Sequence, residues 1–123
     1  MRKKKSVQAS ATLHPRLRVL RGKETVLGPG RVELLEHIER TGSLTAAAKR
    51  MGMSYMRAWS LVKSLNGWFR IALVEAVRGG KSGGGARLTK TGRNVIDLYR
   101  RMEMECHDSV DKNWSELRKL LRE

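Results

Sequence analysis

Residues 43–66, SLTAAAKRMGMSYMRAWSLVKSLN, restrict the possible folds of this chain more than any other stretch. The first part predicts a short helix over residues 44–51, because Ser43 is a good N-cap and three consecutive alanines are strong helix formers. Their small side chains also let a second helix pack close to the first. Gly52 then predicts a sharp turn, since glycine tolerates a positive φ.

A second helix follows this turn. Ser54 can cap it, and Ala58, Leu61, Val62 and Leu65 recur at the spacing of one helical face. Two short helices joined by a tight glycine turn, the second of them amphipathic, form the helix-turn-helix arrangement. This stretch alone leaves open an ordinary helical hairpin in a small bundle.

The composition favours a polyanionic partner. The 123 residues include 26 Lys and Arg against 12 Asp and Glu, which gives a net charge of +14. Such a surplus on one small domain indicates nucleic acid, with solvated surface charge or binding to a membrane surface as the alternatives. No apolar run approaches the roughly 20 residues that span a bilayer, and the N-terminus has no signal-peptide core. We therefore expect no membrane partner and a cytoplasmic, nucleoid-associated protein, which the single cysteine also fits.

The remaining patterns predict a mainly α fold with a little β structure. Residues 1–10 are expected to form a disordered basic arm, and residues 11–92 a DNA-binding domain that opens with a β-hairpin over residues 11–27. An amphipathic helix over residues 31–40 leads into the helix-turn-helix. Residues 93–123 predict a long C-terminal helix.

A glycine-rich hairpin follows the helix-turn-helix. An apolar strand ending at Arg78 leads into residues 79–85, of which five are glycine, and residues 86–88 are the expected return strand. In this position the hairpin is typical of the wing of a winged helix, whose backbone and basic side chains would contact phosphate. A flexible tip without a partner is the alternative. The Gly-Lys-Ser sequence in the loop is typical of a nucleotide-binding P-loop, but Glu75 stands where that motif needs glycine.

An apolar stripe runs along the predicted C-terminal helix. A continuous helix over residues 93–121 would be about 45 Å long, which is longer than a domain of this size is wide. Its far half would leave the stripe exposed in a monomer. We therefore expect a homodimer in which a second copy covers it; a break near residues 106–108, with the last part folded back, is the alternative. The stripe residues expected at the dimer contact are Tyr99, Met102, Cys106, Val110, Trp114, Leu117 and Leu121.

The exposed face of the second motif helix supplies candidate DNA contacts. In a major groove, the N-terminal residues of such a helix approach base edges, and Arg57 is the best candidate for a bidentate contact to guanine. We expect Trp59 to pack in the core or at its boundary rather than to stack on a base. The candidate DNA-binding residues are Ser54, Tyr55, Met56, Arg57, Ser60 and Lys63 on this helix, with Arg78, Lys81, Arg87 and Lys90 around the wing.

A set of short matches supports a family resemblance. They are Gly42-Ser43, Ala47-Ala48-Lys49, Gly52-Met53-Ser54-Tyr55, Ala58-Trp59, Leu65-Asn66, Leu73-Val74, Gly79-Gly80-Lys81, Gly83-Gly84-Gly85-Ala86, Leu88-Thr89 and Gly92. With these residues, the chain over 12–105 resembles the N-terminal DNA-binding domain of ModE-type molybdate-responsive transcription regulators and, more loosely, the winged helices of LysR-type regulators. The resemblance implies a winged helix-turn-helix, dimerisation through the terminal helices and an operator with two-fold symmetry.

Full-length regulators of this kind continue into molybdate-binding domains. This chain ends at Glu123, so we expect no molybdate domain in it and infer no molybdate sensing.

Together these patterns predict a sequence-specific regulator that binds double-stranded DNA as a homodimer and needs no cofactor or metal. A sequence-tolerant architectural nucleic-acid-binding protein is a second hypothesis. A third is a metal- or redox-sensing winged-helix regulator, in which Glu103, Cys106, His107 and Asp108 of two copies would form the site across a dimer. We expect no enzyme, because the three histidines are scattered along the sequence and no nucleophile stands beside a base.

Overall fold

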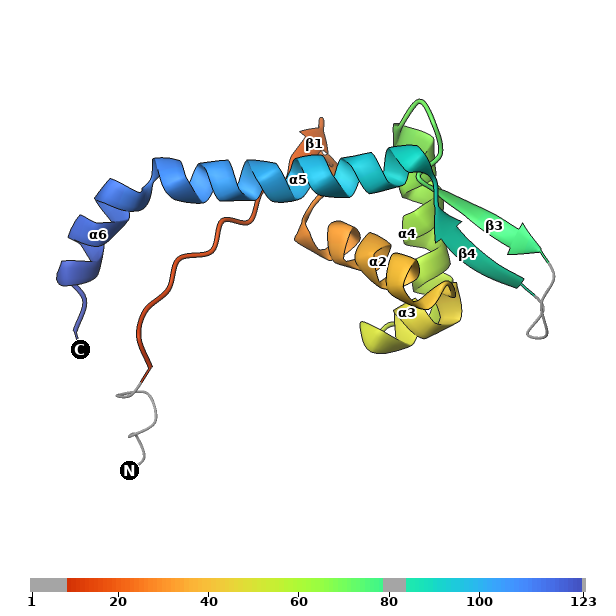
Figure 1. The fold of residues 1–123 in the computed structure, drawn as a ribbon, viewed down its shortest axis with the longest axis horizontal. Coiled ribbons are helices and arrows are strands. Elements are labelled where there is room, and N and C mark those ends of the chain that lie inside the picture. Colours follow the sequence, from red (N-terminus) through yellow and green to blue (C-terminus); the bar gives the residue numbers. More distant parts are fainter. Residues whose placement is uncertain (1–8, 79–83, 123) are drawn as a thin grey trace.

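The computed structural model describes residues 9–78 and 84–122. Most of the expected basic arm, and loop residues 79–83 with the predicted phosphate contact Lys81, lie outside the described residues. Within the described part, helices dominate and two small antiparallel sheets complete the fold, so the predicted fold class is confirmed (Figure 1). No helix in this part of the chain is long and apolar enough to cross a membrane.

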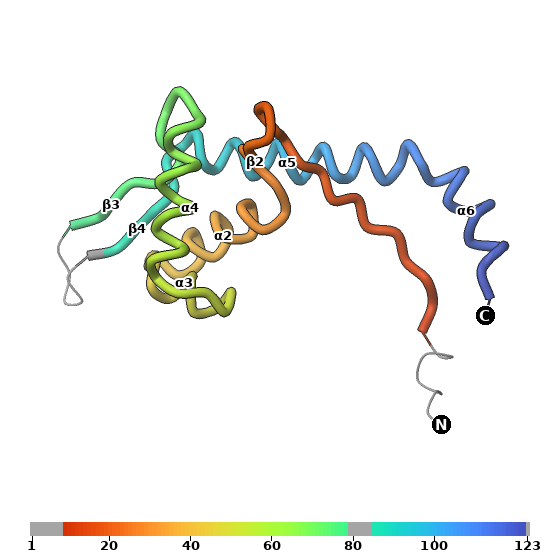
Figure 2. The backbone as a smooth tube through the Cα atoms, turned by 180° about the vertical axis from the view of Figure 1, so that it is seen from behind, coloured from red at the N-terminus to blue at the C-terminus, as the bar shows by residue number. Residues whose placement is uncertain are grey.

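The hairpin before the first helix is shorter than the sequence predicts. Its strands are β1 (Val19–Arg21) and β2 (Glu24–Leu27), which pair antiparallel around a tight turn. The prediction that the hairpin begins at residue 11 was wrong, because residues 9–18 form no strand and extend toward the C-terminal end of the chain (Figure 2). Leu17 still turns inward against the core between two exposed arginines, so the alternation here serves packing rather than a sheet.

The next two helices begin and end at local signals in the sequence. Helix α2 (Pro29–Thr41) ends at Gly42, which adopts a left-handed φ of 69° as a helix C-cap commonly does. Helix α3 (Leu44–Arg50) begins after Ser43, whose hydroxyl accepts a hydrogen bond of 3.0 Å from the Ala46 N–H. This cap satisfies a backbone donor that would otherwise be free, and it confirms the role predicted for Ser43.

The turn and the second motif helix also follow the prediction. Gly52 makes the turn with a φ of 66°. Helix α4 (Tyr55–Trp68) is capped by Ser54, whose hydroxyl accepts a hydrogen bond of 3.1 Å from the Arg57 N–H. The helix continues two residues past its predicted end at residue 66.

The wing consists of β3 (Val74–Arg78) and β4 (Gly84–Leu88), which pair antiparallel. The side chain of Asn66 joins it to the end of α4. The Asn66 Oδ1 accepts hydrogen bonds from the Leu73 N–H (2.8 Å) and the Val74 N–H (3.2 Å), and its Nδ2 donates to the Val74 carbonyl (3.0 Å). The start of the wing is therefore held by α4 itself.

The core is built around α2, which packs against α3, β4 and α5. Four of its apolar side chains are fully buried because neighbouring elements surround the helix (Figure 1). The small alanines of α3 let that helix approach closely. The buried residues of these elements are Val32, Leu34, Leu35 and Ile38 of α2, Ala47 and Ala48 of α3, Ala58 and Leu65 of α4, Leu73 and Val74 at the wing, Ala86 of β4, and Ile96 and Tyr99 of α5.

The C-terminal region holds a long helix and a shorter one. Helix α5 (Lys90–Ser109) ends at Val110, and α6 (Asp111–Lys119) leaves in another direction (Figure 1). The prediction of one continuous helix to residue 121 was therefore wrong. The Ser109 hydroxyl donates to the Cys106 carbonyl (3.0 Å), a bond that competes with the backbone ladder at the break. Helix α6 fully buries no side chain, so it does not fold back onto the core either.

Candidate nucleic-acid interface

The first turns of α4 expose the side chains predicted to enter a DNA groove. Tyr55 and Met56 are 49% and 67% exposed. Arg57, Ser60 and Lys63 also lie on the surface. The opposite face of the helix carries its buried apolar residues, which pack into the core. The core thus fixes which face of α4 is open to a partner.

Two of the predicted contacts already have an intramolecular role. The Ser54 hydroxyl caps α4, as described above. The Lys63 ammonium lies 5.0 Å from the centre of the Trp59 ring, a cation–π arrangement. Trp59 is 43% exposed, so it lies outside the core, at the boundary of the same surface.

The predicted wing residues lie at different distances from this face. Arg78 ends β3, next to the loop that is not described. Arg87 on β4 is paired with Glu75 on β3 (Nε to Oε2, 2.9 Å), which neutralises part of its charge. Lys90 begins α5 and so lies at the base of the wing, at the opposite end of β4 from its tip (Figure 1). Of these three, Arg78 lies nearest the tip of the wing, and it forms no ion pair with another of the described residues.

Three arginines that sequence reasoning missed lie beside Arg57. Arg16 and Arg18 from the N-terminal segment and Arg31 from α2 line, with Arg57, a cleft of about 450 Å³. The alternation Arg16-Leu17-Arg18 was a signal for the first two, because a half-buried Leu17 that packs against the core turns both neighbours to the outside. No sequence pattern placed Arg31 near Arg57, since the two lie on different helices.

Tyr99 is the clearest correction to the predicted dimer contact. It is 1% exposed, and its hydroxyl donates a hydrogen bond of 2.7 Å to the Leu17 carbonyl. Burial raises the pKa of the Tyr99 hydroxyl, and the carboxylate of Glu103 acts in the same direction. A side chain buried in its own domain cannot also contact a second copy.

The other predicted stripe residues remain accessible. Met102, Leu117 and Leu121 are 45%, 52% and 43% exposed. The half-buried members of the stripe line an apolar groove of about 340 Å³ whose other wall is the N-terminal segment. The lining residues are Leu13, Pro15, Cys106, Val110, Asn113, Trp114 and Leu117. The chain's own N-terminal segment therefore covers part of the stripe.

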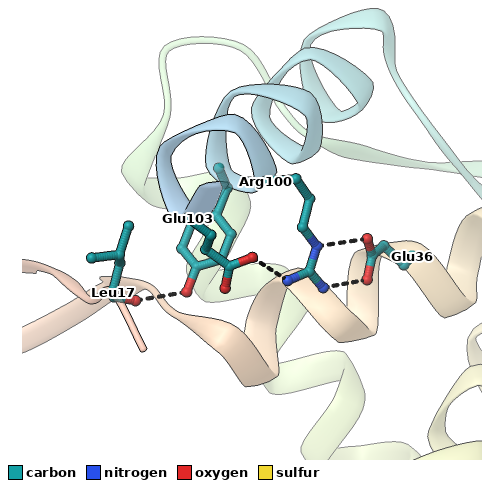
Figure 3. A network of polar contacts seen from close by, with 5 residues as sticks. Leu17, Glu36, Arg100 and Glu103 are labelled. Atoms are coloured by element: carbon teal, nitrogen blue, oxygen red, sulfur yellow. Dashed lines mark hydrogen bonds and ion pairs between the residues drawn. The ribbon is translucent and has the colours of Figure 1, made fainter. Parts of the chain in front are cut away.

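A second cleft collects all three histidines, which the sequence had left scattered. His14, His37 and His107 line a space of about 620 Å³ beside α2 and α5. Within it, Arg100 donates to both carboxylate oxygens of Glu36 (2.6 and 3.0 Å) and to Glu103 (2.7 Å), as Figure 3 shows. The hydrogen bonds from Arg100 lower the pKa of Glu36. This network ties α5 to α2 at the edge of the core, where both helices border the cleft.

The metal-sensing hypothesis needs several ligands in one place. Among residues 9–78 and 84–122, no three His, Cys, Asp or Glu side chains come together as a metal site would require. Two of the three carboxylates that line the histidine cleft, those of Glu36 and Glu103, accept hydrogen bonds from Arg100 instead. The structure thus gives this hypothesis no assembled ligand set within one copy.

These elements define a class of protein. A helix-turn-helix formed by α3 and α4, followed by a β-hairpin wing, is the winged helix-turn-helix fold. More narrowly, the chain belongs to the bacterial regulatory helix-turn-helix proteins of the lysR family, whose family model matches residues 30–93.

Known proteins agree with this assignment. The chain is 41% identical over 88 residues to the molybdenum transport protein ModE of Azotobacter vinelandii, covering 72% of this chain and 33% of that protein. It is 45% identical over 71 residues to the DNA-binding transcriptional dual regulator ModE of Escherichia coli K12, covering 58% of this chain and 27% of that protein. The resemblance inferred from the sequence is therefore confirmed, and the chain spans about a third or less of the length of these relatives.

A solved structure shares the fold. The CbnR DNA-binding domain, crystallised in complex with DNA, superposes with a TM-score of 0.54 at 22% sequence identity. The match covers 72% of this chain and 95% of that one. At this identity the likeness supports the fold of the chain.

Proposed function

We propose that this protein is a transcription regulator that binds specific sequences in double-stranded DNA through its winged helix-turn-helix. One observation supports this most strongly: the first turns of α4 are exposed between the wing and the arginine-lined cleft. A helix so placed fits the major groove with basic groups toward the phosphates on either side. The net charge of +14 suits a polyanionic partner.

The relatives support the same proposal. The Escherichia coli relative is named a DNA-binding transcriptional dual regulator, and the CbnR domain was crystallised with DNA. The matched family is described as regulatory. The activity proposed for this chain is therefore binding rather than catalysis.

Individual contacts follow from the exposed surface. Met56 and Ser60 face outward at the start of α4 and are proposed to meet base edges, with Arg57 reading guanine. Lys63 and Arg78 are proposed to neutralise phosphates. The same role is proposed for Lys81, which lies outside the described residues.

We also propose that the protein acts as a homodimer on a two-fold symmetric operator. The accessible part of the C-terminal stripe, with Met102, Leu117 and Leu121, would be covered by the same region of a second copy. On this proposal residues 11–92 bind DNA and residues 93–123 carry the dimer contact. A dimer places two recognition helices about one turn of DNA apart.

A selection of random duplex DNA on the purified protein at about 50 and 200 mM salt tests the proposal. We expect an inverted repeat to be enriched, with half-sites about one helical turn apart. If no sequence is enriched and affinity collapses at the higher salt concentration, the protein is the sequence-tolerant binder of the second hypothesis.

Sedimentation of the same preparation tests the dimer. We expect a dimer for the natural protein and a shift to monomer for Leu117→Glu, because a charge in an apolar contact is costly. Ser115→Glu, on an exposed position of the same helix, should leave the mass unchanged. A natural protein that sediments as a monomer would contradict the proposal.

A further inference from the structure

The arginine-lined cleft is built from three separate parts of the chain. The N-terminal segment contributes Arg16 and Arg18, the start of α2 contributes Arg31, and the first turn of α4 contributes Arg57. The cleft has a volume of about 450 Å³, room enough for a phosphate group with water. Four arginine side chains therefore line one small space, although no two of the three parts adjoin in sequence.

The charges of this cleft are not neutralised by carboxylates. The ion pairs among the described residues lie elsewhere, for example Arg87 with Glu75 and Arg100 with Glu36, and none includes a cleft arginine. Two of the four cleft arginines, Arg18 and Arg31, donate to neutral hydroxyls instead.

The two hydroxyl partners belong to Ser64 and Thr25. Arg31 Nη1 donates to Ser64 Oγ (3.0 Å), and Arg18 Nη2 donates to Thr25 Oγ1 (2.9 Å). A hydroxyl orients a guanidinium group without cancelling its charge. The guanidinium groups of Arg18 and Arg31 therefore both keep further N–H donors for a ligand.

The pKa of Arg31 reflects the crowding of positive charge in the cleft. Burial lowers the pKa of its guanidinium, and the like charge of Arg57 lowers it further; Glu24 opposes the shift. The net shift is downward, so Glu24 offsets the repulsion between these like charges only in part, and a bound anion would reduce it further. Positive charge gathered in this way favours phosphate, which guanidinium groups bind bidentately.

The backbone adds to the positive potential. Gly28, Pro29 and Gly30 line the cleft at the start of α2, and no side chain caps this helix end. The free N–H groups and the helix dipole at an N-terminus both favour an anion. The arginines are the primary observation, and the helix end acts in the same direction.

The location of the cleft indicates where the phosphate comes from. Met51 and Met53, on either side of the turn between α3 and α4, line it together with Arg57. The cleft therefore opens directly beside the surface proposed to enter the major groove, where a strand of the duplex would pass.

We infer that this cleft binds a phosphate group, and that the group is a backbone phosphate of the bound duplex. The assignment of the phosphate to the duplex rests on the proposed function. The assignment of an anion site to the cleft does not. It extends the interface beyond the helix-turn-helix and wing to the segment before the first helix.

The test uses Arg18→Ala and Arg31→Ala in the full chain, which leave the proposed groove-reading residues unchanged. Arg31→Lys keeps the charge, and Arg70→Ala removes one exposed charge beyond the far end of α4 as a matched control. Thermal unfolding first establishes that each variant is folded. Duplex affinity is then measured against salt concentration for an enriched and a random sequence, and inorganic phosphate binding is measured separately by NMR titration.

A backbone contact predicts a specific pattern. Each alanine variant should reduce the slope of log affinity against log salt by about one, equally for both sequences, whereas Arg31→Lys and Arg70→Ala should keep the natural slope or nearly so. Inorganic phosphate should shift the signals of the cleft residues in the natural protein and do so less in the alanine variants.

The remaining outcomes separate the possible sources. If phosphate titration is lost in the variants but their duplex slope is unchanged, the cleft binds a free phosphate and the duplex assignment is overturned. If folded variants match the natural protein in both measurements, the whole inference is wrong. A natural protein that binds no duplex at all would overturn the proposed function, and the phosphate titration would then decide the anion site alone.

Discussion

The hydroxyl of Tyr99 donates a hydrogen bond of 2.7 Å to the backbone carbonyl of Leu17. It joins α5 to the segment before the hairpin, two regions that are far apart in sequence. Because Leu17 lies between Arg16 and Arg18, this bond also holds the segment that presents both arginines to the cleft. Tyr99 was predicted to contact a second copy, but it instead holds the segment that lines the cleft beside α4.

Removing this bond should destabilise the fold. Tyr99→Phe keeps the buried ring and leaves the Leu17 carbonyl without its partner, so we expect the free energy of unfolding to fall by about 1 kcal/mol. Urea unfolding followed by circular dichroism measures this change. Tyr55→Phe, at a 49% exposed position, is the control and should change stability little. Equal effects of the two substitutions would contradict the role given to Tyr99.

The link between α4 and the wing should depend on Asn66. Asn66→Ala leaves the N–H groups of Leu73 and Val74 without their acceptor, so we expect a loss of about 2 kcal/mol of stability. The wing should also lose its position relative to α4, and duplex affinity should fall even where the protein is folded. Asn94→Ala, on the exposed surface of α5, should do neither. Unfolding curves and duplex titrations together test both parts.

Two glycines should respond oppositely to the same substitution. A Cβ at Gly92 would overlap the carbonyl oxygen of Leu73, and this backbone atom cannot move aside cheaply. Gly92→Ala should therefore lower the free energy of unfolding by about 1–3 kcal/mol or more. A Cβ at Gly67, within α4, meets no atom within 4 Å, so Gly67→Ala should raise stability by about 0.5–1 kcal/mol. A tolerated alanine at Gly92 would show that α5 packs less closely on the strand.

The pairing of Glu36 with Arg100 should make the free energy of unfolding depend on pH. Hydrogen bonds from Arg100 lower the pKa of Glu36, so this carboxylate stabilises the fold above its ordinary pKa of 4.5, and the contribution disappears as pH falls through the lowered value. Glu36→Gln should be less stable than the natural protein at about pH 7, with a difference that shrinks by about pH 3. Glu33→Gln, exposed on the same helix, is the control. A constant difference across this range would count against the pair.

Arg57 lines the cleft and also belongs to the surface of α4 that we propose enters a DNA groove, so its substitution distinguishes two roles. If it reads guanine, Arg57→Ala should weaken specific binding by about 1–3 kcal/mol and relax the sequence preference. Repeating the duplex selection with the variant measures both. A loss of equal size for all sequences would assign Arg57 to phosphate instead, and unchanged affinity would remove it from the interface.

Local signals made much of this fold predictable. Ser43 and Ser54 cap their helices, and Gly42 and Gly52 take the positive φ values expected of them, because each signal acts within a few residues. The family resemblance followed from the same stretch and the glycine-rich wing.

The errors arose where a distant neighbour decided the outcome. The alternation around Leu17 indicated a strand, but its partner proved to be Tyr99 of α5 rather than a second strand. The apolar stripe on the C-terminal helix indicated a dimer contact, yet Tyr99, one of its members, is buried in its own domain and bonded to Leu17. A continuous C-terminal helix was preferred over a break near residues 106–108, because apolar spacing of three or four continues across Val110, where α5 gives way to α6.

The sequence by itself determined the caps, turns and apolar faces of this protein, since these depend on residues within one or two helical turns. Only the tertiary structure decided which distant groups share a surface. It placed Arg31 of α2 beside Arg57 of α4, and His14 near His107, through packing around α2. Electrostatic interaction depends on distance in space and not on separation along the chain, which is why the cleft could be recognised only once the chain was folded.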